Sequence, residues 1–172
     1  MKKQRSRLRV GVDRRAGAWS RGLADRVARA IRATWRFEGR RFLRQHAPKG
    51  RFDGVLVEVA LSDDAEVQGL NRLYRQRDKP TNVLSFALWE GREVPLARGE
   101  RWLLGQLVLA RETVQREAEA AGRSLRNHAV HLAVHGMLHL LGFDHERSAK
   151  EAKRQERRER KILARLGVAN PY

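Results

Sequence analysis

The stretch "HLAVHGMLHLLGFDH", residues 131–145, holds four of the six histidines of this 172-residue chain. So many imidazoles in an apolar run need an explanation, because each buried ring nitrogen requires a polar partner. Ser124 is a suitable N-cap before the run, and Gly142 stands where a helix commonly ends in a left-handed residue. We therefore predict one largely buried helix over residues 124–141 that carries most of these histidines.

At about 100° per residue, this helix places four imidazoles on one stripe roughly 80° wide, those of His128, His131, His135 and His139. His135 and His139 are four residues apart, a spacing that lets both rings reach one ion, and the break at Gly142 brings His145 back toward them. The chain contains no cysteine, so a metal must be held by histidine or carboxylate. We predict that His135, His139 and His145 bind one metal ion, with the fourth position open to water as in catalytic zinc sites.

The same histidine spacing occurs in metzincin peptidases, where a glutamate after the first histidine acts as the general base. Here that position is Gly136, and no methionine follows His145 to form a Met-turn. Proteolysis is therefore the weaker interpretation. A closed structural site with Asp144 as a fourth ligand is a second alternative to the catalytic one.

Alternating apolar patterns predict strands over residues 7–13, 54–62, 81–89 and 102–110. Helical spacing predicts helices over residues 19–37, 111–121, 124–141 and 148–166, and a further one that begins at Ser62 and Asp63. With helices concentrated late in the chain, this order predicts an α+β fold. We expect a single layered domain over 1–172, with a central mixed sheet of about four strands and the metal site on a late helix and the turn after it.

Two of the predicted helices have a recognisable apolar side. The helix over 19–37 repeats Leu23, Val27, Ile31 and Trp35 at helical spacing, with arginines on its other face. In the helix after Asp63, Glu66 is placed for a capping box. We expect its buried side to consist of Leu70, Leu73 and Tyr74.

Charge is unevenly spread along the chain. Of the net charge of +17, residues 1–50 contribute +13, because they hold 16 Lys and Arg against 3 Asp and Glu. This asymmetry favours a polyanionic partner, nucleic acid before membrane, although a solvated basic face is the plain alternative. No stretch approaches the ~18 apolar residues of a membrane helix. We expect a cytoplasmic protein without a membrane partner.

Three segments resemble the YbeY family of metal-dependent bacterial endoribonucleases. They are "HGMLHLLGFDH" (135–145), "LNRLYRQRDKPTNVLSF" (70–86) and "LLGQLVLA" (103–110). The resemblance implies an α+β fold and one Zn²⁺ on the three histidines. It also implies cleavage of single-stranded RNA in the maturation of the 3′ end of 16S rRNA and in ribosome quality control, with ribosomal RNA and the small ribosomal subunit as partners. The alternative within this setting is a non-enzymatic ribosome-assembly factor with a structural zinc.

The resemblance also assigns residues. It makes Arg75 the active-site arginine, suited to phosphate by its forked donors, and we expect Arg75 and His135 to be the catalytic residues. Arg77 and Lys79 are expected neighbours on phosphate, His131 a group near the ligands, and Asp144 a carboxylate that orients a ligand imidazole. Gln106 replaces the aspartate usual in the third segment, so we assign it no catalytic role.

Overall fold

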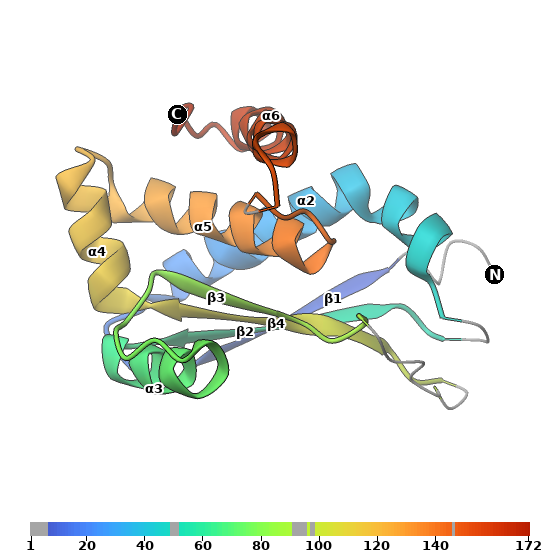
Figure 1. Cartoon of the computed structure of the whole chain (residues 1–172), viewed down its shortest axis with the longest axis horizontal. Helices are drawn as coiled ribbons and strands as arrows, with labels where there is room; N and C mark the ends of the chain where they lie inside the picture. Colours follow the sequence, from blue (N-terminus) through green and yellow to red (C-terminus); the bar gives the residue numbers. More distant parts are fainter. Residues whose placement is uncertain (1–6, 49–51, 91–95, 97–98, 146) are drawn as a thin grey trace.

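A computed structural model describes residues 7–48, 52–90, 96, 99–145 and 147–172 (Figure 1). Its elements, in chain order, are β1 (Leu8–Arg14), α2 (Arg21–His46), β2 (Val55–Ser62), α3 (Asp64–Arg75), β3 (Val83–Ala87), β4 (Trp102–Ala110), α4 (Arg111–Ala120), α5 (Leu125–Leu140) and α6 (Ala149–Arg165). The α+β class is confirmed. Most bounds lie within one or two residues of those that the sequence predicts.

The four strands form one mixed sheet in the order β1-β2-β4-β3. β1 and β4 both pair in parallel with β2, whereas β3 pairs antiparallel with β4. Parallel neighbours need a crossover connection, and α2 supplies the one between β1 and β2. β3 therefore lies at one edge of the sheet and β1 at the other, which fixes where the site can form.

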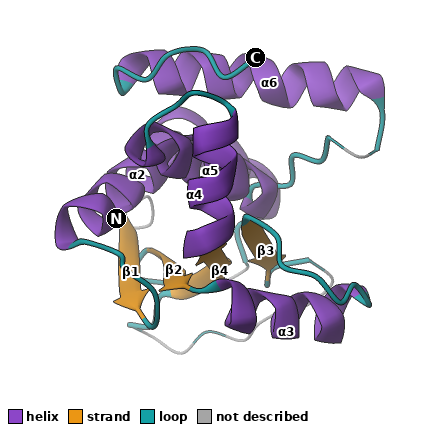
Figure 2. Ribbon diagram, turned by 90° about the vertical axis from the view of Figure 1, so that its left-hand side faces the viewer, coloured by secondary structure: helices purple, strands orange, loops and turns teal. Residues whose placement is uncertain are grey.

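The helices form layers around this sheet (Figure 2). α2 and α5 pack on one face, with α2 contacting β1 and α5 contacting β3 and β4. α6 lies across α2 and α5 as an outer layer, while α3 lies against the opposite face of the sheet. Consequently α5, the histidine-bearing helix, is enclosed between the sheet and α6.

The helix predicted over residues 19–37 is longer than expected, because α2 continues to His46. Its apolar stripe is buried as predicted: Leu23, Val27, Ile31 and Trp35 are at most 8% exposed. Phe42, seven residues beyond Trp35, lies on the same side of the helix and is also buried. This continued stripe keeps the last turns of α2 on the core.

The prediction for the buried side of α3 is wrong at two of three residues. Leu73 is 71% exposed and Tyr74 is 63% exposed, whereas Leu70 packs against a small cluster around Val67. Val67 and Asn71 are the buried residues of α3, so the helix contacts the sheet on a side rotated from the expected one. Leu73 and Tyr74 thus form an apolar pattern on a largely exposed side of α3, and that pattern alone selects the wrong side.

Gly105 in β4 allows β3 and α5 to approach the same point of the sheet. A Cβ atom there would lie 2.4 Å from the backbone oxygen of Phe86 and 2.8 Å from a methyl group of Leu140. Backbone cannot move away from such a contact without breaking the pairing of β3 with β4. The close contact of α5 and β3 with β4 at this point therefore depends on glycine, which has no side chain.

Gly105→Ala is expected to lower the free energy of unfolding by about 1–3 kcal/mol, as other overpacked cores do. Urea unfolding measures this. Gly69→Ala is the matched control, since a Cβ there meets nothing within 4 Å and the site is helical, where alanine is favoured. Equal stability of the two variants would contradict the packing argument.

Candidate metal centre

α5 begins and ends where the sequence predicts. The Ser124 side chain caps the first turn by accepting a hydrogen bond from the backbone of Asn127. At the other end Gly142 has φ of 80°, and the backbone N–H groups of Gly142 and Phe143 donate to the carbonyls of His139 and Leu138. These two bonds form a Schellman motif, which needs a left-handed residue at its centre. The motif turns the chain back toward the last turn of α5.

This turn brings the three predicted ligands together. The Nε2 atoms of His135 and His139 are 3.1 Å apart. The ring of His145 lies 5.1 Å from that of His135 and 4.9 Å from that of His139, measured between centroids. One ligand atom from each histidine lies within 4.8 Å of the others. The structure therefore assembles the three residues that the spacing selected.

The surroundings of His139 suit a metal ligand. Burial, together with the neighbouring His135 and His145, lowers the pKa of His139 to about 4. His139 is therefore neutral at pH 7 and has a ring nitrogen with a free lone pair. Ligand nitrogens of a tetrahedral zinc ion, at about 2.0–2.1 Å from the metal, are roughly 3.3 Å apart, close to the observed spacing of His135 and His139. The donor set and its geometry fit such an ion.

Glu159 of α6 holds the first ligand in position, and the sequence analysis did not identify it. Its carboxylate is fully buried and lies 2.8 Å from Nδ1 of His135 and 2.9 Å from Nε2 of His131. A carboxylate only accepts, so Nδ1 of His135 carries the proton and Nε2 is left free to face the metal position. Tyr172 and Gln155 also donate to this carboxylate.

Burial alone would raise the pKa of Glu159, but the hydrogen bonds from His131 and His135 outweigh it and hold the pKa well below its usual range. The group is therefore an anion inside the protein. Carboxylates in this position behind a metal-binding histidine fix the ring and make it a better ligand. The only sequence signal for Glu159 is its place four residues after Gln155 and three before Ile162, on the side of α6 that is buried.

His131, His135 and Glu159 form a second group that could hold a metal ion. Hydrogen bonds between Glu159 and the two imidazoles already satisfy these atoms. Glu159 is also fully buried, whereas His145 of the first group is exposed. The group that includes His139 and His145 is therefore the better metal site.

The three histidines open into a cavity of about 670 Å³ whose wall also includes Arg75 and Arg77. Arg75 lies in the last turn of α3, which ends at Gln76 in a left-handed conformation. The loop after Gln76 leads into β3, whose residues line the cavity floor. Arg75 and the histidines, 60 residues apart in the chain, thus face one space, as the sequence analysis expected.

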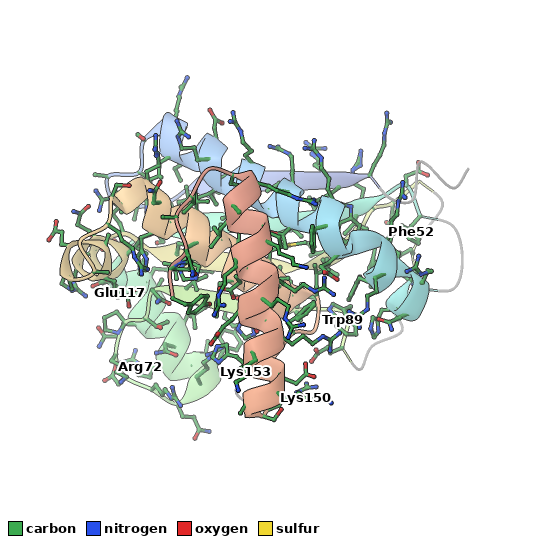
Figure 3. All side chains as sticks on the ribbon, turned by 90° about the horizontal axis from the view of Figure 1, so that it is seen from above. Phe52, Arg72, Trp89, Glu117, Lys150 and Lys153 are labelled. Atoms are coloured by element: carbon green, nitrogen blue, oxygen red, sulfur yellow. The ribbon has the colours of Figure 1, made fainter. Side chains whose placement is uncertain are left out.

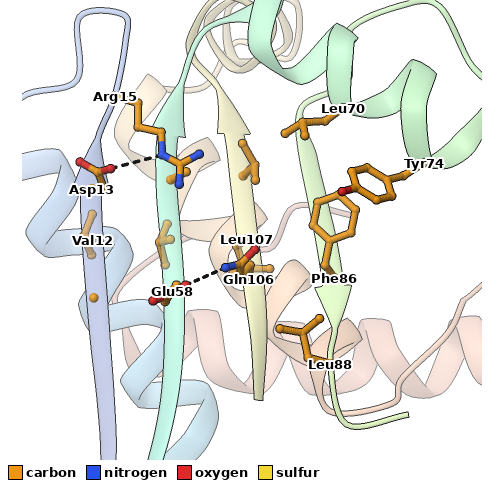
Figure 4. Close-up of a pocket in the computed structure, with 14 residues that line it drawn as sticks. Val12, Asp13, Arg15, Glu58, Leu70, Tyr74, Phe86, Leu88, Gln106 and Leu107 are labelled. Atoms are coloured by element: carbon orange, nitrogen blue, oxygen red, sulfur yellow. Dashed lines mark hydrogen bonds and ion pairs between the residues drawn. The ribbon is translucent and has the colours of Figure 1, made fainter. Parts of the chain in front are cut away.

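The structure shows the surroundings of two residues that depart from known sequence patterns, Gly136 from the metzincin pattern and Gln106 from the YbeY pattern. Gly136 faces the sheet, where a Cβ would lie 2.9 Å from a methyl group of Leu107 and 3.1 Å from the Ser85 hydroxyl, so any side chain there would displace these neighbours. Gln106 lies on the opposite side of the sheet from α5, where it donates to Glu58 at 2.7 Å (Figure 4). An aspartate at position 106 would instead place two carboxylates side by side. Gln106 is therefore remote from the metal cavity, in keeping with the absence of an assigned role.

His128 and Asp144 lie in different surroundings. His128 contacts Glu117 of α4 at 2.8 Å and so belongs to the helix packing. Asp144 lines the cavity and accepts a hydrogen bond from Arg147. Of the tryptophans, Trp19 and Trp35 are buried, and the ring N–H of Trp89 donates to the carbonyl of Leu140 beside the Schellman turn.

Comparison with known proteins gives one consistent answer. A family model described as Endoribonuclease YbeY matches residues 28–167. Proteins named Endoribonuclease YbeY include one from Magnetococcus marinus, 56% identical over 67% of this chain and 82% of its own length, and one from Paramagnetospirillum magneticum, 42% identical over 96% of each. The solution structure of TM1509 from Thermotoga maritima has a similar fold, with a TM-score of 0.50 at 19% identity over 93% of this chain and 91% of that one.

Glu159→Gln is expected to weaken zinc binding by about 10–100-fold, the usual loss when a carboxylate behind a ligand histidine is removed. An amide has one acceptor oxygen for two imidazoles, so one histidine loses its partner. Competition with a chromophoric chelator measures the affinity, at a temperature where circular dichroism shows a folded protein. Glu156→Gln, on the same helix beside the exposed Arg160, is the control and should bind zinc as the unmodified chain does. Unchanged affinity in Glu159→Gln would remove Glu159 from the site.

Proposed function

The chain belongs to the YbeY endoribonuclease family, and on that premise we propose that it is a zinc-dependent endoribonuclease specific for single-stranded RNA. We further propose that it acts in maturation of the 3′ end of 16S rRNA and in ribosome quality control. The observation that carries the proposal is the shared cavity of His135, His139, His145 and Arg75. It combines a metal-binding triad with a guanidinium group, the two kinds of group that phosphodiester hydrolysis uses.

We propose that His135, His139 and His145 hold one zinc ion. When bound, zinc supplies Lewis-acid chemistry that polarises a phosphoryl oxygen and acidifies water. Glu159 keeps the His135 ring oriented with Nε2 toward the cavity, and the low pKa of His139 keeps that ring neutral at physiological pH. These residues prepare the donor set before substrate arrives.

Arg75 is the proposed phosphate-binding catalytic residue. Its guanidinium can pair two phosphoryl oxygens and stabilise the charge that develops on them as the phosphodiester is attacked. Arg77 and Arg147 line the same cavity and add positive charge beside it. The site thus favours an anionic substrate that reaches the histidines from the open side.

The two alternatives are less well supported. A peptidase of the metzincin type needs a general base after the first histidine, and Gly136 has no side chain that could act as one. A purely structural zinc is usually enclosed by four protein ligands, whereas His145 is exposed and the triad opens into the cavity. An open histidine triad that shares its cavity with Arg75 therefore favours RNA hydrolysis.

Ribosomal RNA and the small ribosomal subunit are the proposed partners, which places the protein in the cytoplasm. α2 supports an RNA partner with a row of exposed arginines that includes Arg29, Arg32 and Arg36. We propose that residues 1–172 act as one domain, because β1 completes the sheet and α6 supplies Glu159 to the site. Among the described residues, no helix is long and apolar enough to cross a membrane.

The proposed function is tested by cleavage of defined single-stranded and duplex RNAs with zinc-loaded, chelated and reloaded protein. We expect cleavage of single strands that disappears on chelation and returns with zinc. His135→Ala, purified from a nuclease-free host, should be inactive. Cleavage by the chelated protein or by His135→Ala that equals cleavage by the zinc-loaded chain would contradict the proposal.

Arg75→Ala is expected to lower turnover by about 10²–10³-fold, the loss found when one preorganised charge-stabilising donor is removed. Zinc content and stability should stay near those of the unmodified chain, because Arg75 is exposed and distant from the core. Arg75→Lys should recover only part of the rate, since an ammonium keeps the charge and loses the fork. Single-turnover cleavage measures all three, and equal rates would assign Arg75 to the surface.

A further inference from the structure

The outer face of α6 has a stripe of cations that the proposed function does not yet use. Counting from Lys150 at about 100° per residue, Lys153 lies at about 300°, Arg157 at about 340° and Lys161 at about 20°. All four side chains are exposed. Figure 3 shows α6 lying across the molecule, with Lys150 and Lys153 toward its first turns. These four residues, here called the α6 stripe, form a band of like charge.

The charges of the α6 stripe are not neutralised within the protein. Among the residues that the structure describes, none of the four has an ion-pair partner, whereas the neighbouring Arg154 pairs with Glu151 and Arg158 with Glu38. The three glutamates of α6, Glu151, Glu156 and Glu159, fall at about 100°, 240° and 180°, outside the stripe. Cations crowded together without counter-charges repel one another, so a polyanion lying against them would be bound favourably.

The α6 stripe is connected to the metal cavity by a chain of hollows. A second hollow of about 240 Å³ shares Gly142, Phe143 and Arg147 with the metal cavity. Arg41, from the last turns of α2, and Arg154 also line this second hollow. Arg154 in turn lines the groove formed by the α6 stripe. The hollows therefore lead from the histidines past Arg147 and Arg154 to α6, with the carboxylates of Glu38 and Glu90 also on their walls.

We propose that single-stranded RNA bound in the metal cavity continues over Arg147 and Arg154 and lies with its phosphates against the α6 stripe. The proposal rests on the proposed function, since it extends the same substrate beyond the cavity. From Lys150 to Lys161 the stripe is roughly 16 Å long, at about 1.5 Å per residue. That is long enough to contact more than one phosphate of a flanking strand. Such contacts hold the strand without reading its sequence.

This path makes affinity depend on RNA length. An RNA confined to the cavity gains nothing from α6, whereas a longer strand releases counterions when its phosphates meet the stripe. For single strands, the logarithm of the association constant falls with the logarithm of salt concentration by about 0.7 for each phosphate neutralised. Removing two stripe contacts should therefore reduce this salt slope by about 1.4 for long RNA alone.

The test compares the double variant Lys153→Glu/Arg157→Glu with the control Arg7→Glu/Arg9→Glu. Each reversal changes the charge by two, so both proteins go from +17 to +13. Arg7 and Arg9 are exposed, at the start of the edge strand farthest from β3. The probes are uncleavable single-stranded RNAs of about 4 and about 20 nucleotides, with affinities measured over a range of salt concentrations.

We expect Lys153→Glu/Arg157→Glu to bind the long RNA at least tenfold more weakly and with the reduced salt slope. Its affinity for the short RNA, its zinc content and its cleavage rate at saturating RNA should match those of the control. An unchanged affinity and slope for the long RNA would overturn the proposal, as would an equal loss in the control, which would reflect net charge alone. Loss of binding to anionic lipid vesicles, with RNA binding intact, would assign the stripe to a membrane surface and also overturn it.

The test separates this proposal from the proposed function. If the zinc-loaded chain fails to cleave RNA but still loses long-RNA affinity in Lys153→Glu/Arg157→Glu, the α6 path stands and the catalytic assignment fails. If zinc-dependent cleavage is present and Lys153→Glu/Arg157→Glu leaves the salt slope for long RNA unchanged, the catalytic assignment stands and the α6 path is wrong.

Discussion

The buried carboxylate of Glu159 is the constraint on which the site depends. Moving a carboxylate out of water costs several kcal/mol, and only well-placed partners offset that cost. Here the partners are His131 and His135 on α5, together with Tyr172. α6 can therefore dock on α5 in only one register without leaving the charge unpaired. The same bonds that satisfy Glu159 orient the first of the three converging histidines.

The opposite side of α5 is fixed by the sheet. Gly136 lets the helix lie close to the side chains of Leu107 and Ser85, and Gly105 leaves no Cβ against the backbone of Phe86 and the side chain of Leu140. With α5 held between sheet and α6, the turn at Gly142 delivers His145 to a defined place. The open side then faces Arg75, and a second hollow continues from it past Arg147. Packing thus holds the histidines in a cavity that an anionic strand can enter.

The metal ligands and the buried side of α2 could be predicted from the local sequence pattern. The spacing of His135, His139 and His145, and the glycine between the last two, are contained in eleven residues, so helical geometry and one helix-ending turn bring the ligands together. The long stripe of α2 was similarly clear. What could not be predicted depends on how separate elements pack. Glu159 is one glutamate among many charges on α6, and only the packing of that helix on α5 buries it against the histidines. The buried side of α3 could not be predicted because Leu73 and Tyr74 give the helix an apolar side that stays largely exposed.

The central claim is that one metal ion is held by three imidazoles in front of Glu159. X-ray absorption spectroscopy of the zinc-loaded protein tests it most directly, since the fine structure reports the number and kind of ligands. We expect three imidazole ligands and one further oxygen ligand, at about 2.0–2.1 Å. We also expect loss of one imidazole in His145→Ala. A first shell with two imidazoles and a carboxylate, unchanged in His145→Ala, would place the ion between His131, His135 and Glu159 and contradict the account.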